Sequence, residues 1–159
     1  MGSTLVIGQS ADARATAIEF RPATEVLSQS RVRAIAQDLT DRRPKKLVES
    51  MQAYQLARQP NLVLVDPNNQ QLFCGATGMC NYFVYRIGAS PKQVWHAILR
   101  GVPRGMPQFQ IAPTQSGPPC LVFNQLAESA KSRGLVQQGK LCWQNGEFSL
   151  VAKRTVQPN

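Results

Sequence analysis

The sequence has few acidic residues, one histidine and no long apolar run. No stretch approaches the roughly 18 consecutive apolar residues that a membrane-spanning helix requires, so no membrane span is predicted. Only 9 Asp and Glu occur among 159 residues, and they form no carboxylate pair for acid–base catalysis and no calcium loop. The one histidine, His96, has no nucleophile or orienting partner that the sequence identifies. These absences argue against an enzyme, and a hydrolase is the least favoured class.

Recognisable metal and nucleotide motifs are also missing. The cysteines do not form the Cys-x-x-Cys or Cys/His knuckles of common zinc sites. The loop from Gly75 to Gly78 lacks the Lys and Ser/Thr of a P-loop and does not open a helix, so a tight turn is its simplest interpretation. We therefore predict neither a metal nor a cofactor.

Positive charge is abundant. Lys and Arg number 18, which gives a net charge of +9 and favours anionic partners such as nucleic acid, acidic glycans or anionic lipid. The arginines are scattered from Arg14 to Arg154, a distribution typical of a diffuse positive surface.

The length fits one domain, because a chain of this size buries roughly 70% of its unfolded surface. We expect an N-terminal arm or strand over residues 1–23, a helical part over 24–59 and a β-rich part over 61–154. Met1-Gly2-Ser3 is typical of an expression start. The small-x-small sequence Ala11-Asp12-Ala13 resembles a signal-peptidase site, although an ordinary flexible N-terminus is the alternative.

The helical part contains two periodic segments. In the first, apolar residues from Val26 to Leu39 recur at three- and four-residue spacings, with Thr24 as the N-cap. In the second, Pro44 suits the first turn, and an apolar stripe that includes Tyr54 continues until the helix stops before Pro60. The short connector between them predicts a helical hairpin.

From Asn61 onwards the pattern changes to short β-rich runs. Residues 62–65 and 71–74 are predicted to pair as a hairpin through Asp66-Pro67-Asn68-Asn69. The strongest hairpin signal is Asn145-Gly146, because this dipeptide suits a type I′ turn. Residues 91–100 are ambiguous, since Ser90-Pro91 could start a helix, but the β-branched and aromatic residues that follow favour a strand. Further strands are expected over residues 82–86, 108–111, 121–123, 140–143 and 148–152.

The four cysteines lie at the edges of these strand-like runs. Four cysteines allow three pairings, and the local one joins Cys74 to Cys80 and Cys120 to Cys142. We favour these disulfides, with buried free thiols and a metal site as the alternatives. Disulfides are typical of exported proteins, so the layout predicts a periplasmic or extracellular location.

Several short motifs carry a resemblance to a known group. The series runs from Gly75-x-x-x-x-Cys80-x-x-Phe83-Val84-Tyr85-Arg86 through Pro119-x-Leu121-Val122 to Trp143-x-x-Gly146-x-Phe148. Over about residues 62–150 it resembles small exported bacterial proteins of uncharacterised function. The resemblance implies an envelope location and a β-rich fold, without an activity. Cys120 stands where an acidic residue is commoner, and Phe148 where tyrosine is.

Together these features predict an α+β fold in which an N-terminal helix pair packs on one antiparallel, meander-like sheet stapled by disulfides. The aromatic residues are expected mainly to pack, although they could form a stacking platform. We expect an exported, non-catalytic binding protein, with an envelope protein or an anionic ligand as its partner. A cytosolic nucleic-acid-binding protein is the alternative. The candidate binding residues are Gly75, Gly78, Arg86, His96, Arg100 and Arg104.

Overall fold

The computed structural model describes residues 15–128 and 134–158, which form two compact units. The helical unit comprises residues 19–99. The strand unit comprises the described residues of 15–18, 100–128 and 134–158. The single-domain organisation stays a prediction, and Ala11-Asp12-Ala13 lies outside the described residues.

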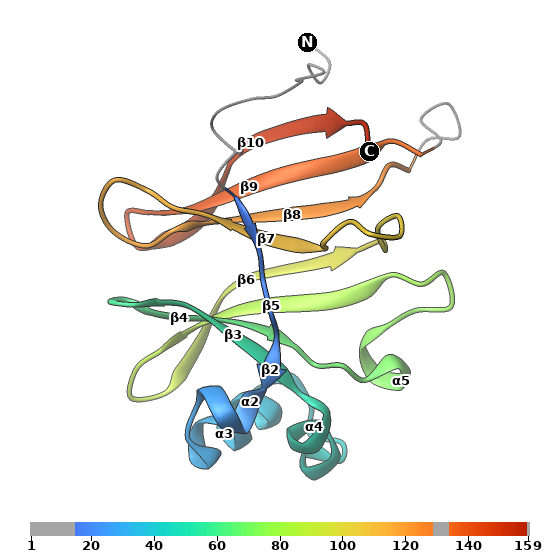
Figure 1. Cartoon of the computed structure of the whole chain (residues 1–159). Coiled ribbons are helices and arrows are strands. Elements are labelled where there is room, and N and C mark those ends of the chain that lie inside the picture. The colour runs from blue at the N-terminus through green and yellow to red at the C-terminus, as the bar shows by residue number, and fades with distance from the viewer. Residues whose placement is uncertain (1–14, 129–133, 159) are drawn as a thin grey trace. The chain divides into compact units, whose positions relative to one another are not determined.

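The helical unit is an antiparallel sheet with helices on one face (Figure 1). Its strand order is β2-β3-β4-β5-β6, and three of its four helices precede β3. Its elements are β2 (Arg21–Pro22), α2 (Ala23–Val26), α3 (Gln29–Leu39), α4 (Pro44–Ser50), β3 (Gln52–Arg58), β4 (Asn61–Asp66), α5 (Gln70–Phe73), β5 (Cys80–Ile87) and β6 (Pro91–Leu99).

The core of the helical unit lies between α2–α4 and the sheet. Ile35 from α3 and Leu47 from α4 are fully buried and belong to the same cluster as Val65 and Tyr85 from the strands. Because alternate residues of a strand share one face, Phe83, Tyr85 and Ile87 all reach this core. The Tyr85 hydroxyl donates to Asp38 Oδ2 at 2.5 Å, which links the central sheet to α3.

The structure differs from the predicted helix pair in two places. α3 takes its N-cap from Ser28, whose side chain accepts from the Arg31 N–H at 3.4 Å, and Thr24 lies inside α2 instead. α4 ends at Ser50, and residues 52–58 form strand β3. The stripe that suggested a continuous helix was misleading because pairing with β4 satisfies the backbone of this segment in an extended form.

Two further predictions concern the strands around β5. Residues 70–73 form α5 instead of a hairpin strand, so β4 pairs with β5. Asn69 causes this change, because its side chain accepts from the Leu72 N–H at 3.1 Å and caps the helix. The strand prediction for the ambiguous segment is confirmed, since β6 runs from Pro91 to Leu99.

The strand unit is a second antiparallel sheet, so the prediction of a single sheet is wrong, while the α+β class and antiparallel pairing are confirmed. Its order is β1-β7-β8-β9-β10. The Asn145-Gly146 hairpin is confirmed, because both residues have positive φ, at 53° and 79°. The elements are β1 (Thr16–Ala17), β7 (Phe109–Ala112), β8 (Cys120–Leu126), β9 (Val136–Gln144) and β10 (Glu147–Val156).

Both predicted disulfides are present. Cys74 pairs with Cys80 in the helical unit, with their Cα atoms 4.0 Å apart. Cys120 pairs with Cys142 across β8 and β9 in the strand unit, with a Cα separation of 4.4 Å. All four cysteines are therefore oxidised, and the free-thiol and zinc alternatives do not apply.

Candidate functional site

The candidate site is the open edge of β3 in the helical unit. On one side β3 pairs with β4 from Gln52 to Arg58. On the other side β2 covers only Gln52 and Ala53. Within the described part of the chain, no strand pairs with this side from Tyr54 to Arg58. An unpaired edge exposes backbone N–H and C=O groups that can pair with another extended chain.

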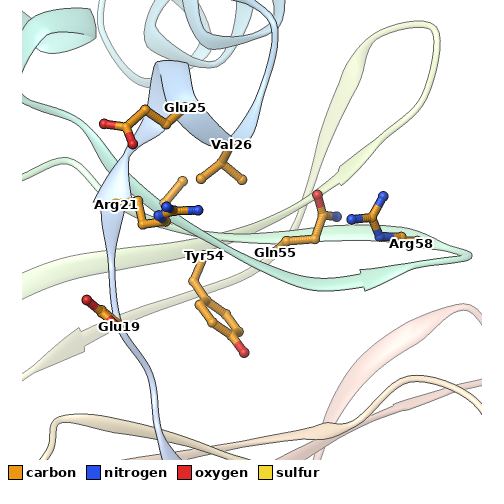
Figure 2. Close-up of a pocket in the computed structure, with 8 residues that line it drawn as sticks. Glu19, Arg21, Glu25, Val26, Tyr54, Gln55 and Arg58 are labelled. Atoms are coloured by element: carbon orange, nitrogen blue, oxygen red, sulfur yellow. The ribbon is translucent and has the colours of Figure 1, made fainter.

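The sequence around β2 explains why the edge is open. Pro22 has no N–H to extend the ladder, and it directly precedes α2. The Ala23 N–H donates to the Met51 carbonyl at 2.9 Å, which attaches the start of α2 beside the start of β3. The chain therefore leaves the sheet after two strand residues, and Val26 of α2 lies over the uncovered edge (Figure 2).

A groove follows this edge. Its larger part is a pocket of about 440 Å³, and a second pocket of about 300 Å³ shares Val26, Gln55 and Arg58 with it. Because three residues line both pockets, we treat them as one edge groove. Figure 2 shows Arg21 and Arg58 at opposite ends of the larger pocket, with Val26 and Gln55 between them. The edge groove is lined by Glu19, Arg21, Glu25, Val26, Leu27, Ser28, Arg31, Ala53, Tyr54, Gln55, Arg58 and Asn61.

Gln55 shapes the floor of the edge groove. It sits at a β-bulge, where the pairing with β4 shifts between Gln55 and Ala57. Its Nε2 donates to the Ala57 carbonyl at 2.6 Å and to Asn61 Oδ1 at 2.5 Å. A β-bulge increases the local twist of a strand and interrupts its ladder, so this part of the edge is not a flat pairing surface.

The charges of the edge groove are unevenly distributed. Arg31 and Arg58 line the end nearest Asn61, whereas Glu19 and Glu25 line the end nearest β2 together with Arg21 of that strand. The Asn61 end is therefore basic and the β2 end is mixed. These five side chains are exposed, and none makes an ion pair with a described residue. The arginine end suits a carboxylate, because a guanidinium binds a carboxylate through parallel hydrogen bonds.

The predicted binding residues are divided between the two units. Gly75, Gly78, Arg86 and His96 belong to the helical unit, while Arg100 and Arg104 belong to the strand unit. That all six form one surface stays a prediction.

The glycine loop uses its own backbone groups. The Gly75 N–H donates to the Met79 carbonyl at 2.8 Å, and the Gly78 N–H donates to the Gly75 carbonyl at 3.1 Å. Gly78 has a φ of 79°, which favours glycine. The tight-turn interpretation is therefore confirmed, and these two N–H groups do not face an anion.

His96 and Arg86 lie on opposite faces of the sheet. The His96 ring stacks on Phe83, which faces the core beneath the helices, with ring centroids 4.6 Å apart. Its Nε2 lies 2.6 Å from Asn81 Oδ1. Because Asn81 Nδ2 donates to the Phe73 carbonyl, its Oδ1 is the acceptor and His96 Nε2 carries the proton. Arg86 lies between two core-facing residues of β5 and therefore projects from the other face.

In the strand unit, Arg100 is already paired. Its guanidinium forms a salt bridge with Glu128 at 3.3 Å, while Arg104 is exposed. The aromatic residues of the helical unit mainly pack, as expected. Phe73 meets Phe83 edge-on at 6.0 Å, and both lie in the core with Tyr85.

Sequence reasoning missed the edge groove because it assigned residues 52–58 to a helix. The available signal was local: Pro22 stops β2 early, and a cluster of turn-forming residues, Gln59-Pro60-Asn61, makes 52–58 and 61–66 a plausible hairpin.

Comparisons with known proteins identify no relative, since no family model, curated protein or solved structure matches this chain. In the part of the chain that the structure describes, no helix is long and apolar enough to cross a membrane. The same residues contain no cluster of three or more His, Cys, Asp or Glu side chains placed to hold a metal ion.

Proposed function

We propose that this protein is an exported, non-catalytic binding protein that holds an extended segment of a protein partner in the edge groove. The observation that carries the proposal is the uncovered stretch of β3 from Tyr54 to Arg58, which lies along a groove. Two disulfides support a periplasmic or extracellular location, because such bonds persist in oxidising compartments. Its partner is then an envelope or extracellular protein.

The partner segment is an extended peptide with an acidic residue. Adding a strand to β3 supplies main-chain hydrogen bonds whatever the peptide sequence, while side-chain contacts provide selectivity. Arg31 and Arg58 provide that selectivity for a carboxylate, and Val26 offers an apolar contact near the middle of the groove. An open strand of five residues spans roughly 16 Å, enough to pair with a short peptide.

The test compares acidic extended peptides with basic ones of equal length by fluorescence anisotropy. Arg58→Glu should weaken binding of the acidic peptides about tenfold, because it replaces an attractive charge with a repulsive one. Arg33→Glu is the matched control, since Arg33 is an exposed arginine that lines a different pocket. Hydrogen exchange should also slow at residues 54–58 when a peptide binds.

Equal weakening by Arg33→Glu, or protection of amides elsewhere while residues 54–58 stay unprotected, would contradict the proposed site. The location is tested separately, by blocking thiols in protein taken from its native source and then measuring intact mass. Four blocked thiols without reduction would contradict export.

The second candidate is a nucleic-acid-binding protein of the cytosol, which the net charge of +9 favours. Phosphate contacts would make binding fall steeply as salt increases. Electrophoretic shifts with single- and double-stranded oligonucleotides at low and moderate salt distinguish it, and no shift at low salt eliminates it.

A further inference from the structure

Another pocket of the helical unit, separate from the edge groove, is lined by positively charged side chains. It has a volume of about 280 Å³ and shares no residue with the edge groove. Its lining contains three cationic side chains, two carboxamides and no carboxylate. We call it the basic pocket, and its residues are Arg42, Arg43, Lys46, Asn69, Gln71 and Leu72.

Local structure places the three cations on one wall. After α3, the Thr40 hydroxyl oxygen accepts from the Arg42 N–H at 3.0 Å and the hydroxyl donates to the Arg42 carbonyl at 3.2 Å. Arg43 then adopts a left-handed conformation with a φ of 49°, and Pro44 starts α4. The Lys46 N–H donates to the Arg43 carbonyl at 3.1 Å, so the two residues belong to the same turn, and both line the basic pocket.

The opposite wall, α5 and the residue before it, is anchored by separate contacts. Phe73 of α5 is buried in the core, and its carbonyl accepts from Asn81 at 2.9 Å. The Ser50 hydroxyl at the end of α4 donates to the Pro67 carbonyl at 2.9 Å. The Cys74–Cys80 disulfide directly follows α5. These contacts hold the two walls in place before any ligand binds.

The charges of the basic pocket have no described counter-ion. Arg42, Arg43 and Lys46 are exposed, and none forms an ion pair with a described acidic side chain. Like charges held close together repel, and a bound anion relieves that repulsion. Guanidinium groups match the oxygens of phosphate, while Asn69 and Gln71 bring carboxamides that can donate N–H groups to the same oxygens.

We propose that the basic pocket binds a phosphate-type oxyanion, either on a soluble molecule or on a lipid headgroup. This site is independent of the edge groove, and each could exist without the other. A diffuse positive surface is the competing explanation, and the neighbouring lysine separates the two. Lys45 has the same charge on the same helix and is also exposed, but it lines a different pocket beside Arg33 and Val48.

The experiment titrates inorganic phosphate into the full chain at constant ionic strength and follows backbone amides by NMR. Shifts should concentrate at residues 40–47 and 69–72. The double variant Arg42→Gln/Lys46→Gln should weaken phosphate binding about tenfold or more, because it removes two charged hydrogen-bond donors. Lys45→Gln should change the affinity less than about twofold. The variants avoid Arg43, whose left-handed backbone makes a substitution harder to interpret.

Vesicles identify the source of the anion. Binding to phosphatidylcholine vesicles that contain phosphatidic acid, lost in Arg42→Gln/Lys46→Gln and kept in Lys45→Gln, supports a lipid headgroup. Phosphate binding with the same variant pattern but without vesicle binding supports a soluble ligand. Equal weakening by Lys45→Gln, shifts spread over basic residues throughout the chain, or no phosphate binding at low salt would overturn the proposal. Oligonucleotide binding insensitive to Arg42→Gln/Lys46→Gln would assign nucleic acid to other surfaces.

Discussion

The two units stabilise antiparallel sheets of five strands by different means. The helical unit covers one face with α2–α4 and builds a large apolar core there, and its disulfide lies beside the sheet at the start of β5. The strand unit carries its disulfide across two paired strands, next to a small apolar cluster that includes Ala112 and Val122. The same face of that sheet also carries a row of polar side chains.

This row, the polar ladder, crosses four strands. Asn124 donates to Gln110 Oε1 at 3.1 Å, Gln138 donates to Asn124 Oδ1 at 2.9 Å, and the Arg154 Nε–H donates to Gln138 Oε1 at 2.7 Å. Asn124 is fully buried and Gln138 is only 7% exposed. A buried amide that lacks a hydrogen-bond partner lowers the stability of the fold, so these side chains need the bonds of the ladder. The helical unit therefore relies on an apolar core beneath its helices, whereas the strand unit, which also buries Phe109, Leu121 and Leu141, adds a cross-strand disulfide and a hydrogen-bonded row of buried polar side chains.

The largest expected change in the free energy of unfolding comes from the core of the helical unit. Leu47→Ala should lower its free energy of unfolding by about 2–5 kcal/mol, because it leaves a cavity at a fully buried site. Chemical denaturation measures this through Trp95, the one tryptophan of the unit, in a Trp143→Phe background. The exposed control Lys45→Ala should stay within about 0.5 kcal/mol of the parent. A loss below about 1 kcal/mol for Leu47→Ala would contradict a core-dependent unit.

The second prediction compares the disulfides. Loop-closure entropy makes Cys120–Cys142, with a separation of 22 residues, worth about 3 kcal/mol. The same relation gives about 2 kcal/mol for Cys74–Cys80, with a separation of 6. Double serine variants of each pair measure both values, with Trp143 reporting the strand unit in a Trp95→Phe background. If removing Cys74–Cys80 lowered the free energy of unfolding more than removing Cys120–Cys142, the predicted order of the two disulfides would be wrong.

The third prediction breaks the polar ladder. Asn124→Ala should destabilise the strand unit by about 1–3 kcal/mol, because it leaves a buried amide donor of Gln138 without its acceptor. Denaturation followed through Trp143 measures the loss. Gln137→Ala is the control, since Gln137 is adjacent in β9 but lies outside the ladder. Similar losses of unfolding free energy from both variants would show that the ladder stabilises the strand unit no more than an ordinary side chain of β9 does.

The smallest expected effect is at alkaline pH, where the units should differ. All three tyrosines lie in the helical unit. Burial, with a smaller contribution from Asp66, raises the pKa of Tyr82 to about 12. Burial, followed by the hydrogen bond to Asp38, also raises the pKa of Tyr85. A phenol whose pKa is higher in the folded state stabilises fully below the unfolded pKa of about 10 and loses that contribution as pH rises through the folded value.

The helical unit should therefore lose stability between about pH 10 and pH 12. The rise of about 2 in the pKa of Tyr82 corresponds to about 3 kcal/mol at most, and solvent screening of this partly exposed phenol lowers the expected loss to on the order of 1–2 kcal/mol. Trp95 and Trp143 report the two units in parallel denaturation series across this range. Tyr82→Phe should reduce the loss in the helical unit. An unchanged pH dependence in Tyr82→Phe would assign the alkaline transition to other groups.

Predictions based on turn residues and cysteine spacing were confirmed, whereas those based on the spacing of apolar residues were confirmed only in part, as for α3. The Asn145-Gly146 turn and the cysteine pairing follow from short-range chemistry, and both are present. Strand β6 was predicted from its β-branched and aromatic residues, against the local helix-start signal at Ser90-Pro91. Residues 52–58 and 70–73 were assigned to the wrong element, because short apolar segments fit either a helix or a strand. The edge groove was missed with them, since a groove beside β3 cannot be inferred while β3 is taken for a helix.

The basic pocket shows a related limit. Its three cations lie within the short segment Arg42 to Lys46, which the sequence displays directly, but the partner wall comes from α5, more than 20 residues away. Proximity in the chain shows that the charges are close together. Only the fold shows that Asn69 and Gln71 line the same pocket, whose described lining residues include no carboxylate.

The sequence by itself determined the antiparallel β-rich character, the tight turns, the disulfide pairing and the net charge, because turn dihedrals, short loop closure and composition are local properties. Tertiary structure decided the number of sheets, the identity of β3 and α5, and the open edge of β3. Those outcomes depend on which strands pair and which faces are buried, and the free energy of such pairing is shared between segments distant in sequence.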